Sequence, residues 1–336
     1  MKQKRLLIIS LGVLLLAWAV PALRLLNPYL VQILMYVGIN MILTLSLNLV
    51  NGYMGEFSVG HAGFMAIGAY ISSILTVAVL PPGWGPFLFM PVLAVGGLAA
   101  AAAGLVVAVP SFKTRGDYLA IVTLAFNMIV KSVLENLDIV GGPRGYLGMS
   151  RLTTLFWVAA WVLITLFFLR HLVYSNFGRG ILAIREDEVA ANLTAVDTRR
   201  LKVYAFCISA FFAGVAGGLF AHLLQFINPD SFSILKSTEM LVMVYLGGTG
   251  SLAGSLIGAG IFTILIELLR PIEMLVAAGA GYLAAFLPVI LGTPLLFIAT
   301  LFLRRWVLIP IMLVLLMIFR PLGIMGFKEW GWLKPR

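Results

Sequence analysis

Charged, redox-active and metal-binding residues are all scarce in this sequence. Only 11% of its 336 residues are Asp, Glu, Lys or Arg, whereas about a quarter of an average soluble domain is charged. The single cysteine, Cys207, excludes an internal disulfide, and neither it nor the three histidines has the spacing of a metal site. The sequence also lacks the Gly-x-x-x-x-Gly-Lys-Ser/Thr loop that holds nucleotide phosphates. These absences argue against an enzyme, a metalloprotein and a chain that hydrolyses ATP by itself.

Apolar residues, in contrast, make up 62% of the chain, and the mean hydropathy is +1.07. Several continuous runs reach the roughly 20 apolar residues that a helix needs to cross a bilayer. The strands of a membrane β-barrel would instead show apolar and polar residues in alternation. We therefore expect an all-α, polytopic integral membrane protein, a single domain over 1–336 with about 9–10 transmembrane helices. The predicted spans are 6–26, 29–50, 60–80, 86–109, 118–139, 153–173, 203–227, 240–269, 275–302 and 306–319.

Two of the predicted spans contain helix-breaking residues. Glycines interrupt 240–269, and Pro288, Gly292 and Pro294 interrupt 275–302. Such residues permit broken helices or a re-entrant hairpin, and a single crossing and a hairpin are both open for 275–302. The first span also resembles a secretory signal peptide, but its apolar run continues past Ala22 and favours an uncleaved helix.

Basic residues give the orientation of the spans, because they accumulate on cytoplasmic loops. Lys2, Lys4 and Arg5 place the N-terminus inside, and alternating spans then place the segment 174–202 inside as well. On this assignment 15 of the 23 basic residues lie inside and four outside. The net charge of +10 therefore reflects topology and gives no reason to expect nucleic acid as a partner. We expect a multi-pass protein of a bacterial-type inner (plasma) membrane with a cytoplasmic N-terminus.

The segment 174–202 is a polar island between apolar spans, with five basic and four acidic side chains in 29 residues. Val189, Leu193 and Val196 recur at helical spacing, and the acidic residues just before them suit the first turn of a helix. Asp197 or Thr198 can cap the helix that follows. We expect a short amphipathic helix whose apolar stripe needs a partner or the membrane surface to cover it. A helix that only anchors the topology is the alternative.

Ordered sequence blocks along most of the chain carry a family resemblance. They are Leu45-Ser-Leu-Asn-Leu-Val-Asn-Gly52, Phe57-Ser-Val-Gly-His-Ala-Gly63, Gly116-Asp-Tyr-Leu-Ala-Ile-Val-Thr-Leu-Ala-Phe126, Gly141-Gly-Pro-Arg-Gly145, Arg185-Glu-Asp-Glu-Val-Ala-Ala191, Arg199-Arg-Leu-Lys202, Leu246-Gly-Gly-Thr-Gly-Ser251 and Phe319-Arg-Pro-Leu-Gly323. Together they resemble LivM-type permeases, the membrane subunits of ABC importers for branched-chain amino acids. The family usually has Gly at the position of Ala195, so the short helix is expected to end differently here.

The resemblance implies that 174–202 is a cytoplasmic loop that couples the permease to its ATPases. The residues implied in coupling are Arg185, Glu186, Asp187, Glu188, Val189, Ala190, Leu193, Ala195, Arg199, Arg200 and Lys202. It also implies a second, LivH-like permease, two LivG/LivF-like cytoplasmic ATPases that bind ATP and Mg, and a substrate-binding protein. The chain itself would need no cofactor, and membrane lipid would surround it. Leucine, isoleucine and valine are the implied substrates, with urea or amides as the alternative within the family.

Polar residues at membrane depth are costly and usually face the protein interior. Asn127, Lys131 and Glu135 lie on one face of 118–139, and with Asn48 and Gln225 they are candidates for a translocation path. A Lys131–Glu135 pair that only neutralises itself is the alternative. A stand-alone secondary transporter or channel, in which these charges and Glu267 couple ions, is the alternative from another class.

Glycines at four-residue spacing predict close helix packing, because small residues let transmembrane helices approach. One stripe comprises Gly214 and Gly218, and the other comprises Gly250, Gly254 and Gly258. A half-unwound segment that lines a path is the alternative for these glycines.

Overall fold

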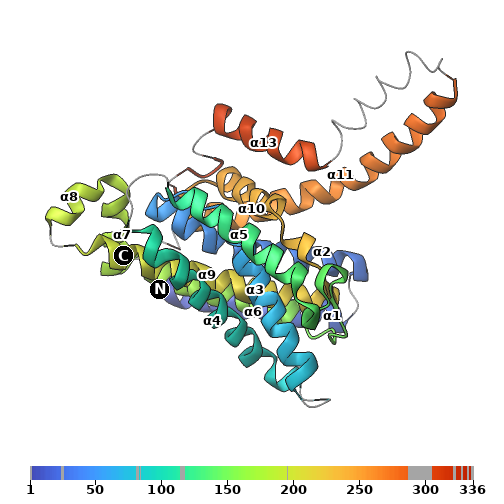
Figure 1. Ribbon diagram of the computed structural model, residues 1–336, viewed down its shortest axis with the longest axis horizontal. Helices are drawn as coiled ribbons and strands as arrows, with labels where there is room; N and C mark the ends of the chain where they lie inside the picture. The colour runs from blue at the N-terminus through green and yellow to red at the C-terminus, as the bar shows by residue number, and fades with distance from the viewer. Residues whose placement is uncertain are drawn as a thin grey trace.

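The structure is a computed structural model that describes residues 2–23, 26–80, 83, 85–113, 118–194, 196–286, 305–320, 323–326, 328–330 and 333. This part of the chain is almost entirely helical (Figure 1). The α-helices are α1 (Lys2–Ala22), α2 (Pro28–Asn48), α3 (His61–Ile74), α4 (Gly85–Ser111), α5 (Tyr118–Asn136), α6 (Leu155–Val173), α7 (Asn176–Glu186), α8 (Glu188–Leu193), α9 (Thr198–Leu224), α10 (Ile234–Gly247), α11 (Leu252–Phe286) and α13 (Arg305–Phe319).

Shorter elements connect these helices. The π-helices η1 (Leu49–Met54) and η2 (Leu75–Val79) extend α2 and α3, and the 3₁₀-helices are η3 (Asp138–Val140), η4 (Gly142–Arg144) and η5 (Pro229–Phe232). The strands β1 (Tyr146–Leu147) and β2 (Phe226–Ile227) pair antiparallel. They join the connection after α5 to the connection after α9.

Seven helices of the described residues are long and apolar enough to cross a membrane, which confirms an all-α polytopic membrane protein. They are Pro28–Met54, His61–Val79, Leu88–Ser111, Tyr118–Asn136, Leu155–Val173, Thr198–Leu224 and Leu252–Pro271. Two shorter apolar helices, Ser10–Ala22 and Ile309–Phe319, coincide with the first and last predicted spans.

The predicted interruption of 240–269 is present, but it separates two helices. α10 has 14 residues, or about 21 Å, which is less than the hydrocarbon thickness. A turn at 248–251 then reverses the chain into α11. The sequence interpretation was wrong about the next boundary, because α11 continues through Pro271 to Phe286 instead of breaking near 270. The rest of the predicted span 275–302 lies outside the described residues.

The second glycine stripe differs from the prediction at one position. Gly250 lies in the turn before α11 with φ +75°, a left-handed conformation that favours glycine. Gly254 and Gly258 do pack closely: a Cβ on Gly254 would lie 2.5 Å from the carbonyl oxygen of Gly247, and one on Gly258 would lie 2.3 Å from that of Met243. These glycines therefore hold the α10–α11 hairpin together.

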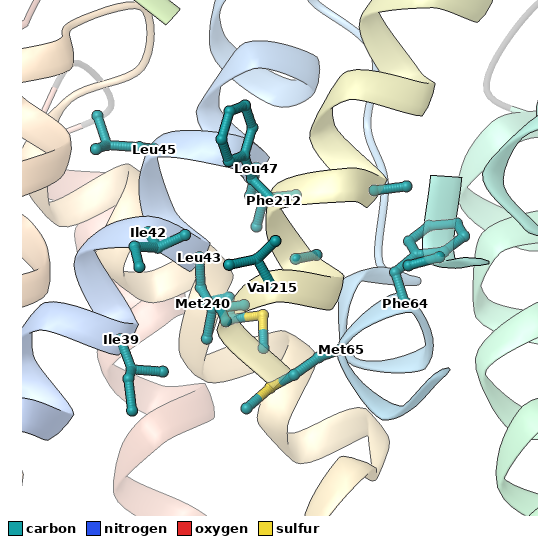
Figure 2. Close-up of a cluster of buried hydrophobic side chains, with 14 of the residues drawn as sticks. Ile39, Ile42, Leu43, Leu45, Leu47, Phe64, Met65, Phe212, Val215 and Met240 are labelled. Atoms are coloured by element: carbon teal, nitrogen blue, oxygen red, sulfur yellow. The ribbon is translucent and has the colours of Figure 1, made fainter. Parts of the chain in front are cut away.

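The centre of the bundle forms where α9 packs against α3 and α4. A Cβ on Gly68 of α3 would lie 2.1 Å from the carbonyl oxygen of Gly214, and one on Gly218 would lie 2.5 Å from a methyl carbon of Leu93. Apolar side chains of α2, α3, α9 and α10 complete the core, with Leu43, Val215 and Met240 gathered at its middle (Figure 2). Glycine on both sides is what lets the backbones of α3 and α9 touch.

This contact predicts that Gly68→Ala destabilises the protein. The added methyl would meet backbone and not a movable side chain, so we expect the free energy of unfolding to fall by about 1–3 kcal/mol. Thermal unfolding of the detergent-purified protein measures the change. Gly260→Ala in α11 is the control, because its Cβ would meet only the end of Met41 at 3.8 Å. Equal melting temperatures for the two variants would contradict this packing.

Candidate functional site

The polar island folds into two short helices where one was predicted. α7 begins after Ser175, whose hydroxyl accepts a hydrogen bond from the Gly178 N–H at 3.3 Å. Asp187 is extended (φ −160°, ψ 110°) and separates α7 from α8. Its carboxylate accepts hydrogen bonds from the N–H groups of Val189 and Ala190, at 2.8 and 3.0 Å. Asp187 therefore acts as an N-cap, and only Glu188 of the three acidic residues falls in the first turn of α8.

α8 projects from one end of the bundle, with α7 beneath it (Figure 1). We call this end the α8 end. Val189 is 66% exposed and Leu193 83% exposed, so these two members of the predicted apolar stripe face outward, whereas the third, Val196, follows α8 and is half-buried. α7 differs, because it buries Ile181 and Ile184 against the bundle. α8 is thus an exposed apolar surface on an anchored base.

The remaining coupling residues divide into exposed and buried groups. Glu186, Ala190, Arg199 and Arg200 are exposed, and Arg200 pairs with the N-cap Asp197 at 2.9 Å. Ala195 lies outside the described residues. Lys202 is the exception: it is only 6% exposed.

Lys202 is the charged centre of the site. Its ammonium pairs with Glu56 at 2.5 Å and with Glu188 at 2.9 Å, and it lies 5.8 Å from the centre of the Phe112 ring. Glu56 follows η1 and Glu188 begins α8, so one cation joins three segments. Removing one member of a buried ion pair leaves an uncompensated charge, which is strongly destabilising.

Sequence reasoning missed Glu56. It is the first acidic residue of the chain and it stands between two apolar spans, a signal that could have marked it for pairing. Its partner is 146 positions away, which sequence periodicity cannot indicate.

The end of α7 rests on η1. Arg185 donates a hydrogen bond to the carbonyl oxygen of Gly52 at 3.2 Å and pairs with Glu186 at 2.7 Å. Gly55, with φ +78°, leaves room for this arginine, since a Cβ there would lie 2.7 Å from its side chain. The π-helical end of α2 is therefore in direct contact with the polar island.

Asn48, a predicted path residue, fastens η1 to the α10–α11 turn. It is fully buried, and its amide donates to the Ser251 carbonyl at 2.9 Å and to the Ser255 hydroxyl at 2.7 Å. Its oxygen accepts from the Gly250 N–H at 2.9 Å. Both donors and the acceptor of the amide are thus used within the chain.

The C-terminal segment closes over the same region. The Glu329 carboxylate accepts hydrogen bonds from the N–H groups of Leu252 and Ala253 and from the Tyr53 hydroxyl, so it caps α11. Arg170 of α6 donates to the Leu333 carbonyl at 2.7 Å. Burial raises the pKa of the nearby Tyr174 phenol, and the negative charge of Glu329 raises it further.

The other predicted path residues belong to separate contacts. The Lys131–Glu135 pair is present at 3.5 Å, and Asp230 of η5 adds a second carboxylate at 2.6 Å that sequence reasoning missed. Asn127 is 3% exposed beside Gly63. Gln225 closes α9 in a left-handed conformation (φ +63°) and donates to the Met149 carbonyl at 3.4 Å.

The fold and the site define a class of protein: a polytopic helical membrane protein with a polar helical element at one end. In the part of the chain that the structure describes, no group of three or more His, Cys, Asp or Glu residues could hold a metal ion. The chain belongs to the family described as branched-chain amino acid transport system / permease component, whose model matches residues 29–273.

Relatives within this family are similar along most of the chain. The high-affinity branched-chain amino acid transport system permease protein LivM of Escherichia coli is 36% identical over 303 residues, covering 80% of this chain and 69% of the relative. LivM of Salmonella typhimurium is 37% identical over 267 residues, which cover 69% of this chain and 61% of the relative. LivH of Salmonella typhimurium is 23% identical over 241 residues, which cover 65% of this chain and 77% of the relative. No solved structure matches the chain.

The burial of Lys202 predicts that Lys202→Met is strongly destabilising. It leaves Glu56 without its cation, and removal of one partner of a buried pair costs about 3–5 kcal/mol. Arg200→Met is the matched control, because its pair with Asp197 is exposed and worth at most about 1 kcal/mol. Thermal unfolding in detergent measures both. If Lys202→Met melts no earlier than Arg200→Met, the assigned role of Lys202 is wrong.

Proposed function

We propose that this chain is the transmembrane permease subunit of an ATP-driven importer for branched-chain amino acids in the inner (plasma) membrane. The LivM and LivH relatives carry that substrate in their names, and the bundle supplies seven apolar spans among its described residues. Urea and amides are the alternative substrates within the family. Among the charges that a secondary transporter would use, Lys131 is already paired with both Asp230 and Glu135.

The proposal includes three kinds of partner protein. A LivH-like permease completes the path, two cytoplasmic LivG/LivF-like ATPases bind and hydrolyse ATP with Mg, and a substrate-binding protein delivers the amino acid. Similarity of one chain to both LivM and LivH relatives supports a pair of related permeases. In this arrangement the N-terminus and 174–202 are cytoplasmic, as the distribution of basic residues favours.

One observation carries the coupling role: α8 exposes Val189 and Leu193 while Lys202 fixes its first turn to the bundle. An exposed apolar stripe on a rigid base is suited to docking in a groove of a partner. Movement of the ATPases would then act on α9 through Lys202 and on η1 through Arg185. Because these connections are charged and largely buried, α8 transmits displacement instead of absorbing it.

The exposed stripe predicts that Leu193→Glu weakens ATPase binding without unfolding the permease. Its side chain is 83% exposed, so the chain alone should melt as before. Loss of a central apolar contact at an interface costs about 2 kcal/mol or more. Co-purification with the ATPases and substrate-stimulated ATP hydrolysis measure the effect.

Ile139→Glu is the matched control, because Ile139 is 85% exposed but lies in η3, away from α8. It should retain the ATPases. If Leu193→Glu and Ile139→Glu co-purify with equal amounts of ATPase, α8 is not the docking surface.

A further inference from the structure

A cavity of about 160 Å³ lies between α2, α10 and α11. It is lined by residues 33–40 of α2, the first turns of α10 and residues 262–270 of α11. The α10–α11 turn lies against Asn48 near the α8 end, so the cavity lies toward the opposite end of these helices.

Two ion pairs face this cavity. Lys236 pairs with Glu239 at 2.8 Å, and Arg270 pairs with Glu267 at 2.7 Å. The side chains of Lys236, Glu239 and Glu267 are only 18–25% exposed, and Arg270 is 49% exposed. All four charges lie near the end of a helix or span: Lys236 and Glu239 in the first turns of α10, and Glu267 and Arg270 in the last residues of the span Leu252–Pro271.

Neither ion pair joins two helices. Each links residues three positions apart on one helix, a pairing that contributes only about 0.2–0.5 kcal/mol. Stabilisation of the contacts between helices therefore does not explain why four charged side chains surround one cavity. The Tyr29 hydroxyl of α2 donates a hydrogen bond to Glu267 of α11, so a neutral side chain connects the two helices here.

The rest of the cavity wall is mixed. Asn40 donates to the Thr263 hydroxyl at 2.9 Å, which gives one polar side. Ile33, Tyr36, Phe262 and Ile266 supply apolar surface. A small pocket with a few polar groups and apolar walls is the usual form of a ligand site.

We propose that this cavity binds a zwitterionic α-amino acid during translocation. Arg270 and Lys236 provide donors for the carboxylate, and Glu239 and Glu267 provide acceptors for the ammonium group. The apolar wall receives an aliphatic side chain. Two cations and two anions balance a zwitterion, whereas an isolated anion or cation would leave one charge unpaired in a low-dielectric site.

This inference rests on the proposed function, and it names residues that contact the transported solute. It also favours amino acids over urea and neutral amides, because those solutes carry no charges for the four side chains to bind.

The test compares two double variants in the assembled transporter, reconstituted in liposomes with its partner permease, ATPases and binding protein. Lys236→Met/Glu239→Gln removes both charges and leaves the net charge unchanged. Lys236→Arg/Glu239→Asp keeps both charges and is the matched control. Uptake of radiolabelled leucine, subunit assembly and ATP hydrolysis are measured for each.

We expect the neutral variant to assemble and hydrolyse ATP normally while its leucine uptake falls at least about tenfold, the factor that corresponds to 1.4 kcal/mol. The charge-conserving variant should stay within about threefold of the unchanged chain, because it retains the charge-assisted contacts. Normal uptake by the neutral variant would overturn the proposal. An equal loss of leucine uptake in both variants would also overturn it, because the side chains would then act by their shape. Loss of subunit assembly would overturn it as well, because the side chains would then support the fold.

The unchanged transporter separates this proposal from the function on which it rests. If it takes up leucine and the neutral variant does so equally well, only the assignment of the cavity is wrong. If it takes up urea or amides but no leucine, the proposed substrate class is wrong and the cavity proposal falls with it.

Discussion

The structure depends most on one buried cation, the ammonium of Lys202 between Glu56 and Glu188. A charge buried at the end of a membrane span must be paired, because an isolated one would cost several kcal/mol. The pairing fixes three segments to each other: the start of α9, the connection between η1 and α3, and the first turn of α8. The polar element therefore cannot shift without moving the spans that hold it.

From this cation, contacts continue into the bundle. Arg185 connects α7 to η1, and Asn48 connects the α2–η1 junction to the α10–α11 turn. α10 and α11 then extend to the cavity that carries the two ion pairs. The π-helical form of η1 is relevant here, since π-helical segments occur frequently at functional sites. A continuous series of hydrogen bonds and rigid helices thus joins the exposed stripe of α8 to the far end of the bundle.

The sequence predicted the features that depend on local pattern. Apolar run lengths predicted the spans from 29–50 to 203–227, the charge density of 174–202 marked the polar element, and helical spacing indicated the Lys131–Glu135 pair. Of the two residues expected to cap α9, Asp197 and Thr198, the structure has Asp197 as the N-cap. Features that depend on tertiary contacts were missed. Glu56 pairs with a residue 146 positions away, Asp187 divides the expected single helix, and α11 continues through Pro271.

The central claim is that α8 moves as one body with α9 and that this movement reaches the cavity. It is tested most directly by distances between spin labels in the assembled transporter, with and without ATP, after Cys207→Ser removes the native thiol. One label pair, Asn192→Cys with Tyr204→Cys, reports α8 against α9, and a second, Leu30→Cys with Leu268→Cys, reports α2 against α11 beside the cavity. The account predicts an unchanged first distance and a second distance that changes with ATP. A first distance that changes while the second stays constant would contradict it.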